Sequence, residues 1–209
     1  MIKYSSFSSS YQLTQDQKIA LNDFCSWLDS DNFDEPFVLS GFAGSGKTFL
    51  SMRLLRKVEE KGICWTVVAP THKAVGVLKD ALRIEGLNAT WYPSTIHRLL
   101  RLKIKRQGSL EVCEQTDQTM GCLDPLGLVL VDEASMVDSN LLEIALKSSY
   151  EGKTRLVFVG DPAQLPPIGE SKSPVFSMSR SFTSALKEVV RHQGPVLKLA
   201  SRLRDGTLP

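Results

Sequence analysis

The stretch Gly41-Phe42-Ala43-Gly44-Ser45-Gly46-Lys47-Thr48 fits the pattern G-x-x-x-x-G-K-[ST] at every specified position. This pattern is typical of a loop that binds the phosphates of a nucleoside triphosphate. Glycines let backbone N–H groups approach phosphate oxygens closely, and Lys47 supplies a positive charge for the β- and γ-phosphates. The Thr48 hydroxyl is the expected ligand of a magnesium ion. We therefore expect nucleotide contacts at Gly41, Ala43, Gly44, Ser45, Gly46, Lys47 and Thr48.

The neighbours of this phosphate loop have the context that the motif requires. Residues 37–39 form a short apolar run between Pro36 and Gly41, which predicts a strand. Residues 49–57 mix apolar and basic side chains at helical spacing, which places the phosphates at a helix N-terminus. A chance match of a glycine-rich turn is the alternative, and the correct flanks argue against it.

The composition is that of a globular protein. The chain has 209 residues, 42% of them hydrophobic, which suits one domain or one domain with a small insertion. It has no run of 18 apolar residues and no apolar segment among its first ten residues, so we expect a cytoplasmic protein without membrane contact. We also expect a monomer. The net charge is only +2, so any argument for nucleic acid must come from local patches. Four cysteines without a C-x-x-C pair predict neither zinc nor disulfides.

Apolar runs and helical patterns alternate along the chain. Runs at 63–68, 128–131 and 156–159 predict buried strands, and residues 73–83 and 140–148 predict helices between them. This order is typical of an α/β fold with a parallel sheet covered on both faces. Residues 14–28 predict a helix that Thr14 caps, residues 1–12 a flexible N-terminus, and residues 171–184 a polar loop.

Ligands of such sheets bind beyond the carboxyl ends of the strands, where further polar residues collect. Asp132 and Glu133 directly follow one run, and we expect them at the end of a strand that neighbours the strand of the phosphate loop. Asp132 is a candidate magnesium ligand and Glu133 a candidate base for the attacking water. Taken alone, the pair is equally compatible with an acidic helix N-terminus.

A proline-rich loop, residues 160–167, follows the next strand. Gln164 in this loop is a candidate sensor of the γ-phosphate. The prolines restrict where Gln164 can lie, so a rigid turn is as good an interpretation of the loop as a sensor.

Residues 98–126 interrupt the α/β rhythm. Residues 100–105 alternate with period two, and after Gln107-Gly108-Ser109 comes a second alternating stretch, which predicts an inserted β-hairpin. The alternation places Arg101, Lys103 and Lys105 on one face of it, where they can meet a phosphate backbone. A solvated strand face remains the alternative.

Several motifs together resemble superfamily 1 helicases. Residues 44–48, 132–135 and 160–166 resemble motifs I, II and III, while residues 69–74 and 94–97 resemble motifs Ia and Ib of the 5′-to-3′ branch typified by RecD and Dda. The resemblance covers nearly the whole chain and implies ATP and Mg²⁺ as cofactors. It assigns adenine recognition to Gln17 and a γ-phosphate contact to Arg191, although a surface arginine is the alternative for Arg191.

The same resemblance implies single-stranded DNA as a partner. It assigns the strand's path to five residues of motifs Ia and Ib: Pro70, Thr71, His72, Thr95 and His97. Without the motifs, Thr71 is best interpreted as a helix cap, and either histidine is best interpreted as a structural residue. The hairpin corresponds to the strand-separating pin of the family, but its tip at residues 107–109 carries no aromatic wedge.

The resemblance implies a RecA-like phosphate-loop ATPase domain at residues 13–97 and 127–209, with 98–126 as a 1B-like insertion. No match to motifs V and VI follows Arg191, so we expect a second RecA-like domain to be absent and the chain to be a fragment or one half of a split motor. The hypothesis is the motor domain of a 5′-to-3′ DNA helicase from a bacterial cell or a phage-infected host, with replication or repair proteins as candidate partners. An ATP-dependent switch without motor action and an RNA helicase remain alternatives.

Overall fold

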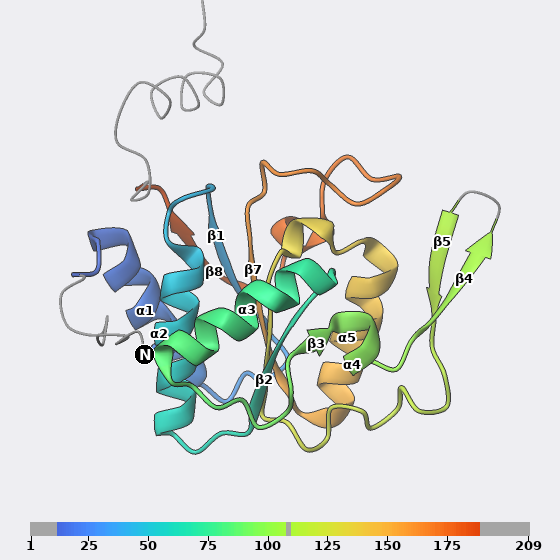
Figure 1. The fold of residues 1–209 in the computed structure, drawn as a ribbon, viewed down its shortest axis with the longest axis horizontal. Coiled ribbons are helices and arrows are strands. Elements are labelled where there is room, and N and C mark those ends of the chain that lie inside the picture. Colours follow the sequence, from blue (N-terminus) through green and yellow to red (C-terminus); the bar gives the residue numbers. More distant parts are fainter. Residues whose placement is uncertain (1–11, 108–109, 189–209) are drawn as a thin grey trace, which may run out of the picture.

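A six-stranded parallel sheet forms the centre of the protein. The computed structural model describes residues 12–107 and 110–188. The strands lie in the order β3-β2-β6-β7-β1-β8 (Figure 1). Their bounds are β1 (Phe37–Gly41), β2 (Trp65–Ala69), β3 (Ser94–Thr95), β6 (Leu128–Val131), β7 (Arg155–Gly160) and β8 (Phe182–Leu186). The prediction of an α/β fold with a parallel sheet is confirmed.

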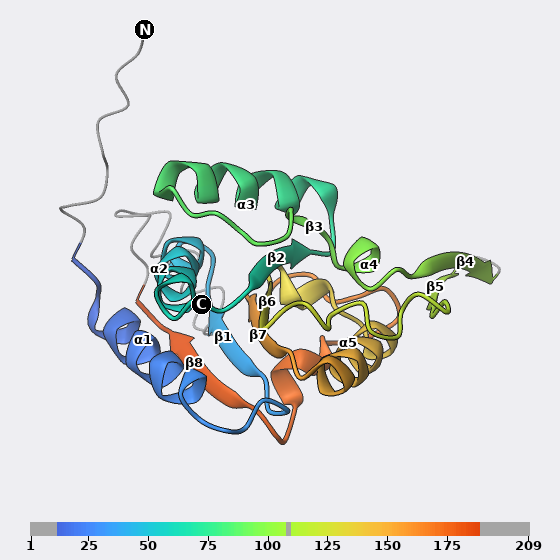
Figure 2. The ribbon, with the colours of Figure 1, turned by 90° about the horizontal axis from the view of Figure 1, so that it is seen from below.

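Helices cover both faces of the sheet, as Figure 2 shows. One face packs against α1 (Gln15–Leu28), α2 (Lys47–Glu60) and α3 (His72–Glu85), and the other against α4 (Ile96–Leu99) and α5 (Ser139–Gly152). Successive residues of one strand alternate between the two core clusters, so Leu39 packs with α1 and α2 while Val38 packs on the opposite side. The central strands are therefore buried on both faces, which explains their continuous apolar sequences.

Helix α1 begins where the sequence predicts. Thr14 caps it through a capping box, in which Thr14 Oγ1 accepts the N–H of Gln17 and Gln17 Oε1 accepts the N–H of Thr14. The helix packs on the sheet through an aromatic cluster of Phe24, Trp27 and Phe37, with ring centroids 5.4 to 5.5 Å apart. This packing fixes the position of Gln17 relative to β1.

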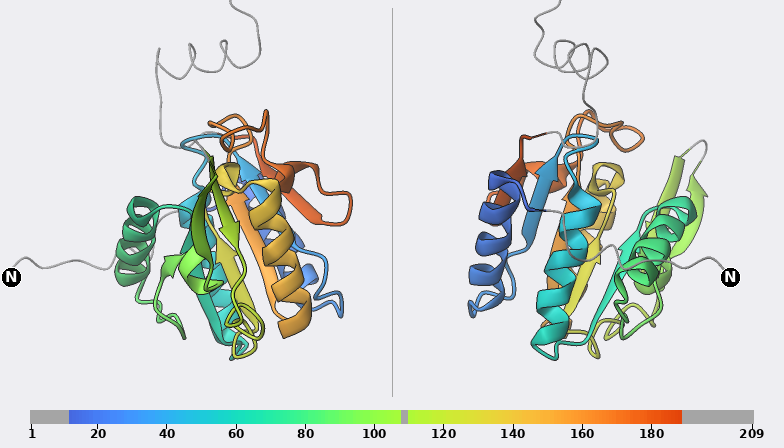
Figure 3. Two further views of the ribbon diagram at one scale, coloured as in Figure 1. Left: turned by 90° about the vertical axis from the view of Figure 1, so that its right-hand side faces the viewer. Right: turned by 60° about the vertical axis from the view of Figure 1, so that its left-hand side comes forward.

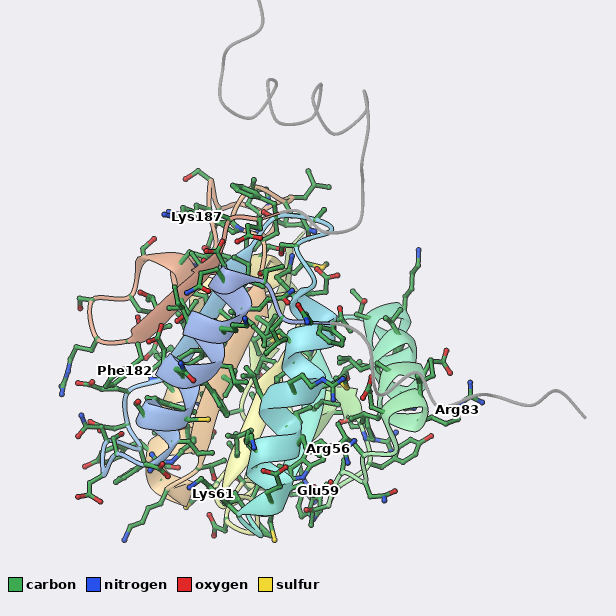
Figure 4. The ribbon with its side chains drawn as sticks, turned by 90° about the vertical axis from the view of Figure 1, so that its left-hand side faces the viewer. Arg56, Glu59, Lys61, Arg83, Phe182 and Lys187 are labelled. Carbon is green, nitrogen blue, oxygen red and sulfur yellow. The ribbon has the colours of Figure 1, made fainter. Side chains whose placement is uncertain are left out.

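Two strand predictions need correction. The stretch 171–184 is not only a polar loop, because β8 begins at Phe182 and pairs in parallel with β1. Figure 4 shows Phe182 at the start of this strand and Lys187 just beyond its end, near α1. Only Ser184 and Leu186 of β8 are buried, as befits an edge strand, so no apolar run marked it. Cys64, expected inside an apolar strand, is exposed and precedes β2.

The expectation that Asp132 follows a strand next to that of the phosphate loop is wrong. β7 pairs with both β1 and β6 and so lies between them. Chain order does not determine strand order in a parallel sheet, because each crossover can skip a position. The residue that ends up beside the phosphate loop is Asp161, which follows β7. Figure 3 shows the loops after β1 and β7 at the same end of the sheet.

The predicted hairpin is present and projects from the domain (Figure 1). Strands β4 (Lys103–Gln107) and β5 (Leu110–Glu114) are antiparallel, with Lys103 opposite Glu114 and Lys105 opposite Val112. The flanks of the hairpin belong to the core of the domain, since the leucines on both sides are buried: Leu99, Leu100, Leu123 and Leu126.

Among the described residues, no helix is long and apolar enough to cross a membrane.

A buried serine fastens the segment after β7 to the segment after β6. Ser173 is 2% exposed, and its one hydroxyl hydrogen is shared between the carbonyl oxygens of Ala134, 2.9 Å from Oγ, and Val137, 2.6 Å from Oγ. These two residues begin and follow the short 3-10 helix η1 (Ala134–Met136) next to Glu133. Ser173 therefore helps to hold the backbone on which Glu133 lies.

We expect Ser173→Ala to lower the free energy of unfolding by about 1–2 kcal/mol, because two buried carbonyl oxygens lose their donor. Urea denaturation measures the change. Ser177→Ala is the matched control, since Ser177 is exposed in the neighbouring 3-10 helix η2 (Pro174–Ser177). Equal effects of the two substitutions would contradict the anchoring role of Ser173.

Candidate nucleotide and nucleic-acid site

The phosphate loop ends at the N-terminus of α2, as the sequence predicts. Gly46 is the N-cap residue, with a left-handed backbone (φ 86°) and no side chain to cap the helix. A Cβ at Gly46 would lie 2.6 Å from Gln17 Nε2, and one at Gly41 would lie 2.7 Å from Ser45 Oγ. Both positions therefore require glycine. A helix N-terminus without a capping side chain suits an anionic ligand.

Lys47 lies over the loop from which it extends. Its Nζ donates to the carbonyl oxygens of Gly41 at 2.7 Å and Phe42 at 3.1 Å. Burial lowers the pKa of Lys47, and the carboxylates of Asp161, Asp132 and Glu133 oppose this effect. The lysine therefore shares one site with these three acids, and a phosphate would have to compete with the two carbonyl oxygens for it.

Gln17 contacts the phosphate loop directly. Its Nε2 donates to the carbonyl oxygen of Ser45 at 3.1 Å, while its Oε1 accepts from Thr14. One hydrogen of the amide nitrogen is not used in these two bonds, and the side chain is only 3% exposed. Gln17 thus braces the loop, and the adenine recognition that the resemblance implies would use the remaining Nε2 hydrogen or the second lone pair of Oε1.

Two other loop residues use their backbone groups inside the protein. The N–H of Ser45 donates to Phe42 O at 3.1 Å, and the Ser45 hydroxyl is buried without a hydrogen-bond partner among the described residues. The N–H of Ala43 donates to Asp161 Oδ2 at 2.8 Å. Asp161 was not among the predicted site residues, although it follows an apolar strand just as Asp132 does.

Asp132 is a partly buried acid whose charge acts on Lys47 of the phosphate loop. Burial is the main cause that raises its pKa to about 6, with a smaller increase from Glu133 and a decrease from the N–H of Glu133 and from Lys47. That N–H donates to Asp132 Oδ1 at 2.9 Å. A partly buried carboxylate with little compensation is a group that a divalent cation would stabilise.

Glu133 has a strained backbone. Its φ is 55° and its ψ 42°, a left-handed conformation that non-glycine residues rarely adopt. Such strain costs on the order of 1 kcal/mol and concentrates at functional sites. Glu133 lies at the turn between β6 and η1, and its unusual backbone conformation sets the direction in which its side chain leaves the chain.

Gln164 is exposed, and its N–H donates to the carbonyl oxygen of Asp161 at 3.1 Å. It lies close to the loop in sequence and fold, but no contact of its side chain with the site is present among the described residues. Arg191 lies outside the described residues.

The predicted DNA residues at the ends of β2 and β3 act as caps. Thr71 Oγ1 accepts the N–H of Ala74 at 3.2 Å at the start of α3, and Thr95 Oγ1 accepts the N–H of Arg98 at 3.3 Å at the start of α4. His72 is exposed, as the first residue of α3. Because β2 and β3 are parallel neighbours and Ala69 pairs with Thr95, Pro70 lies one residue beyond this pair at the same end of the sheet.

A cleft at the foot of the hairpin joins three other predicted residues. It has a volume of about 510 Å³, and His97, Arg101 and Lys103 lie in its wall together with Asp117. Burial lowers the pKa of His97, so the ring is neutral at neutral pH and offers a ring face or a hydrogen bond rather than a charge.

The prediction that alternation places Arg101 on one face with Lys103 and Lys105 is wrong. Arg101 has a left-handed backbone (φ 54°) and precedes β4, so the alternation starts only at Lys103. Lys105 also pairs with Glu114 at 2.5 Å, which offsets its charge. Arg101 and Lys103 nevertheless meet in the cleft.

The arrangement fits a Mg²⁺–nucleoside triphosphate. Three features lie at one end of the sheet: a helix start with a bare glycine cap, a lysine held by two carbonyl oxygens and a partly buried acid of raised pKa. Fold and site thus define a phosphate-loop nucleotide-binding domain.

Comparison with known proteins gives the family. The model of the AAA domain family matches residues 12–209, and the chain belongs to this family. Its relatives include uncharacterized protein R530 of Acanthamoeba polyphaga mimivirus, 31% identical over 92% of this chain and 42% of the relative. The ATP-dependent DNA helicase dda of Enterobacteria phage T4 is 29% identical over 80% of this chain and 37% of its own length. The ATP-dependent RecD2 DNA helicase of Deinococcus radiodurans is 29% identical over 82% of this chain and 22% of its own length.

Solved structures agree in fold. Bacteroides Pif1 bound to single-stranded DNA has a TM-score of 0.63 at 21% identity and covers 96% of this chain and 48% of its own. Bacteroides sp. Pif1 with ADP-AlF4 has a TM-score of 0.61 at 20% identity, with the same coverage. The RecA-like fold is thus confirmed, the chain is a homologue of superfamily 1 DNA helicases, and it spans less than half of the length of these relatives.

We expect Asp132→Asn to stabilise the metal-free protein at pH 7.5 by about 1–3 kcal/mol. The folded protein holds the carboxyl with a pKa of about 6, above the unfolded value. The wild type therefore loses stability as pH rises from about 4 to 6, and the amide does not. Urea denaturation with a chelator at pH 7.5 and 4.5 measures the difference.

The control for this change is Asp117→Asn, since Asp117 is exposed. A gain from Asp132→Asn that is the same at both pH values would contradict the buried-acid account, as would the absence of any gain at pH 7.5.

Proposed function

We propose that this chain is the ATP-binding motor domain of a 5′-to-3′ DNA helicase that couples ATP hydrolysis to movement along single-stranded DNA. The observation that carries the proposal is the junction of the phosphate loop, Asp132 and the strained Glu133 at one end of a RecA-like sheet. Membership of the AAA domain family and homology to ATP-dependent DNA helicases support it. We retain residues 13–97 and 127–209 as the ATP-binding unit and 98–126 as its insertion.

In this proposal each group has one task. Backbone N–H groups at the start of α2 and the Lys47 ammonium bind the phosphates, and Thr48 and Asp132 hold Mg²⁺, which neutralises charge that develops on the phosphates. Glu133 orients the attacking water and accepts its proton. Gln17 braces the loop against α1 and offers one hydrogen to adenine. Gln164 and Arg191 are proposed contacts of the γ-phosphate.

The DNA strand is proposed to cross the ends of β2 and β3 and to enter the cleft beside the hairpin. Thr71 and Thr95 cap the N-termini of α3 and α4, which begin at this edge of the sheet. The exposed His72 is the first residue of α3. Arg101 and Lys103 supply positive charge in the cleft, where His97 offers a neutral ring. Stimulation of ATP hydrolysis by single-stranded DNA in the complete enzyme would separate a motor from a nucleotide-dependent switch.

We expect Lys47→Ala to reduce affinity for Mg²⁺–ATP at least about 100-fold, because the partly buried positive charge proposed to bind the phosphates is lost. Glu133→Gln is expected to keep the affinity within about threefold and to lower hydrolysis by the complete enzyme at least about 100-fold. Titration with a fluorescent ATP analogue and a phosphate-release assay measure the two effects.

Lys57→Ala is the matched control on the same helix, since Lys57 is exposed and pairs with Glu60 at 2.7 Å. Normal hydrolysis by the glutamine variant would remove Glu133 from its assigned role. Unchanged affinity in Lys47→Ala would remove the nucleotide site itself.

We expect Lys103→Ala to weaken binding of single-stranded DNA about three- to tenfold at low salt, equally for all sequences. The slope of the logarithm of affinity against the logarithm of salt concentration is expected to fall by the amount due to about one phosphate contact. Fluorescence anisotropy across a salt series measures both. Lys61→Ala removes the same charge at the far end of α2, just before β2 begins, as Figure 4 indicates, and is expected to have no effect. Equal losses in both variants would mean that only net charge matters.

A further inference from the structure

A glycine separates the strand of the phosphate loop from the turn that carries Glu133. Gly160 is the last residue of β7 and pairs with Ser40 of β1, the residue before the phosphate loop. On the other side of β7, the pairing with β6 ends at Val131 and Phe158. The same register, continued by two residues, places Glu133 beside Gly160. Gly160 therefore lies between two parts of the proposed ATPase site.

The space beside Gly160 has no room for a side chain. A Cβ at this position would lie 3.0 Å from the backbone nitrogen of Ala134 and 3.2 Å from its Cβ. It would also lie 3.0 Å from Cζ of Phe176 in η2. Carbon atoms pack best at about 3.5–4.0 Å, so either the turn or the ring would have to move. The backbone of Gly160 is not left-handed, so this position requires glycine for its small size.

The turn that carries Glu133 is also held from its other sides. Ala134 is fully buried, and its carbonyl oxygen accepts from the Ser173 hydroxyl, with 2.9 Å between the two oxygens. The N–H of Glu133 donates to Asp132 Oδ1 at 2.9 Å, and the backbone of Glu133 is left-handed. Such a conformation persists only where its surroundings determine it. Gly160 supplies the part of these surroundings that also borders β1.

We propose that Gly160 is a positioning residue for Glu133, because its bare backbone sets how closely the Glu133 turn approaches the strand of the phosphate loop. A general base has to lie within hydrogen-bond reach of the proton that it accepts, and a misplacement of about 1 Å can lower the rate about 100-fold. Gly160 touches neither nucleotide nor water in this scheme. The inference rests on the ATPase function proposed above, since it concerns the base of that reaction.

The surroundings of Gly160 predict an effect on hydrolysis and not on nucleotide binding. The three atoms nearest to an added Cβ all belong to Ala134 and Phe176. The proposed phosphate contacts come instead from the loop after β1 and from the start of α2. A methyl group at position 160 would therefore press on the Glu133 turn and on η2 without displacing the phosphate loop.

The test compares Gly160→Ala with wild type in the complete enzyme. We expect the affinity for a non-hydrolysable ATP analogue to stay within about threefold and kcat for ATP hydrolysis to fall about tenfold. Fluorescence titration and a phosphate-release assay measure the two effects. Adding Gly160→Ala to Glu133→Gln, which already lacks the base, is expected to cause little further loss of kcat. A full further tenfold loss would contradict action through Glu133.

Gly152→Ala is the matched control, since Gly152 lies before the start of β7 and Gly160 lies at its end. A Cβ at Gly152 would lie 3.1 Å from Thr154 Oγ1 and 3.3 Å from the backbone nitrogen of Asp124, so this glycine is crowded as well. We expect Gly152→Ala to lower the free energy of unfolding but to keep kcat. Equal losses of kcat in the two alanine variants would refute the inference, because destabilisation alone would then explain them.

The outcomes separate failure of this inference from failure of the proposed function. If the wild-type enzyme does not bind and hydrolyse ATP, the proposed function is wrong. If the wild-type enzyme does both and Gly160→Ala keeps its kcat, Gly160 does not position Glu133. A loss of affinity as large as the loss of kcat would also overturn the inference, because Gly160 would then support the phosphate loop itself.

A second pair of variants covers the case in which Gly160→Ala does not fold. Phe176→Leu removes the ring atom nearest to the added methyl group, and Phe176 is only partly buried. In this background Gly160→Ala presses mainly on Ala134. We expect kcat of the double variant to be about tenfold lower than that of Phe176→Leu alone. Equal kcat values of these two proteins would overturn the inference.

Discussion

Burial of the parallel sheet on both faces is the constraint on which the rest of the structure depends. The four central strands β2, β6, β7 and β1 carry few or no polar side chains because helices cover them on either side, and the sheet leaves only its ends for chemistry. All six strands run in one direction, so every loop with polar residues after a strand meets at one end. The phosphate loop, Asp132, Asp161, Pro70 and Thr95 are neighbours for this reason alone.

At that end, the functional groups are already bonded to one another. Lys47 is held by carbonyl oxygens of its own loop, Gln17 by Ser45 and Thr14, and Ala43 by Asp161. Each bond offsets the burial of a polar group that would otherwise be unpaired. A ligand at this site therefore replaces existing interactions instead of filling empty space, and its affinity is a difference between two sets of bonds.

The predictable and unpredictable parts of the protein divide by the range of the interactions. Local patterns predicted the cap at Thr14, the apolar strands and the helix after Lys47, because each depends on residues a few positions apart. The order of the strands depends on crossovers that no local pattern records, so β7 was not expected between β1 and β6 and the position of Asp161 was missed. β8 was missed because an edge strand with polar residues on one side has no apolar run. Arg101 was misplaced for a related reason. The alternating sequence pattern runs through Arg101, but its left-handed backbone conformation interrupts the extended chain before β4 begins.

The pairing of β8 with β1 has a mechanical consequence. Leu186 lies opposite Gly41, and its Cβ would be 2.9 Å from a Cβ at that position, so the last residue of β8 sits directly against the first residue of the phosphate loop. Asp16 of α1 then accepts the N–H groups of Lys187 and Glu188 and ties the chain down where it leaves the sheet. Tension applied to the chain beyond Glu188 would thus reach the phosphate loop through β8 and through the carboxylate of Asp16.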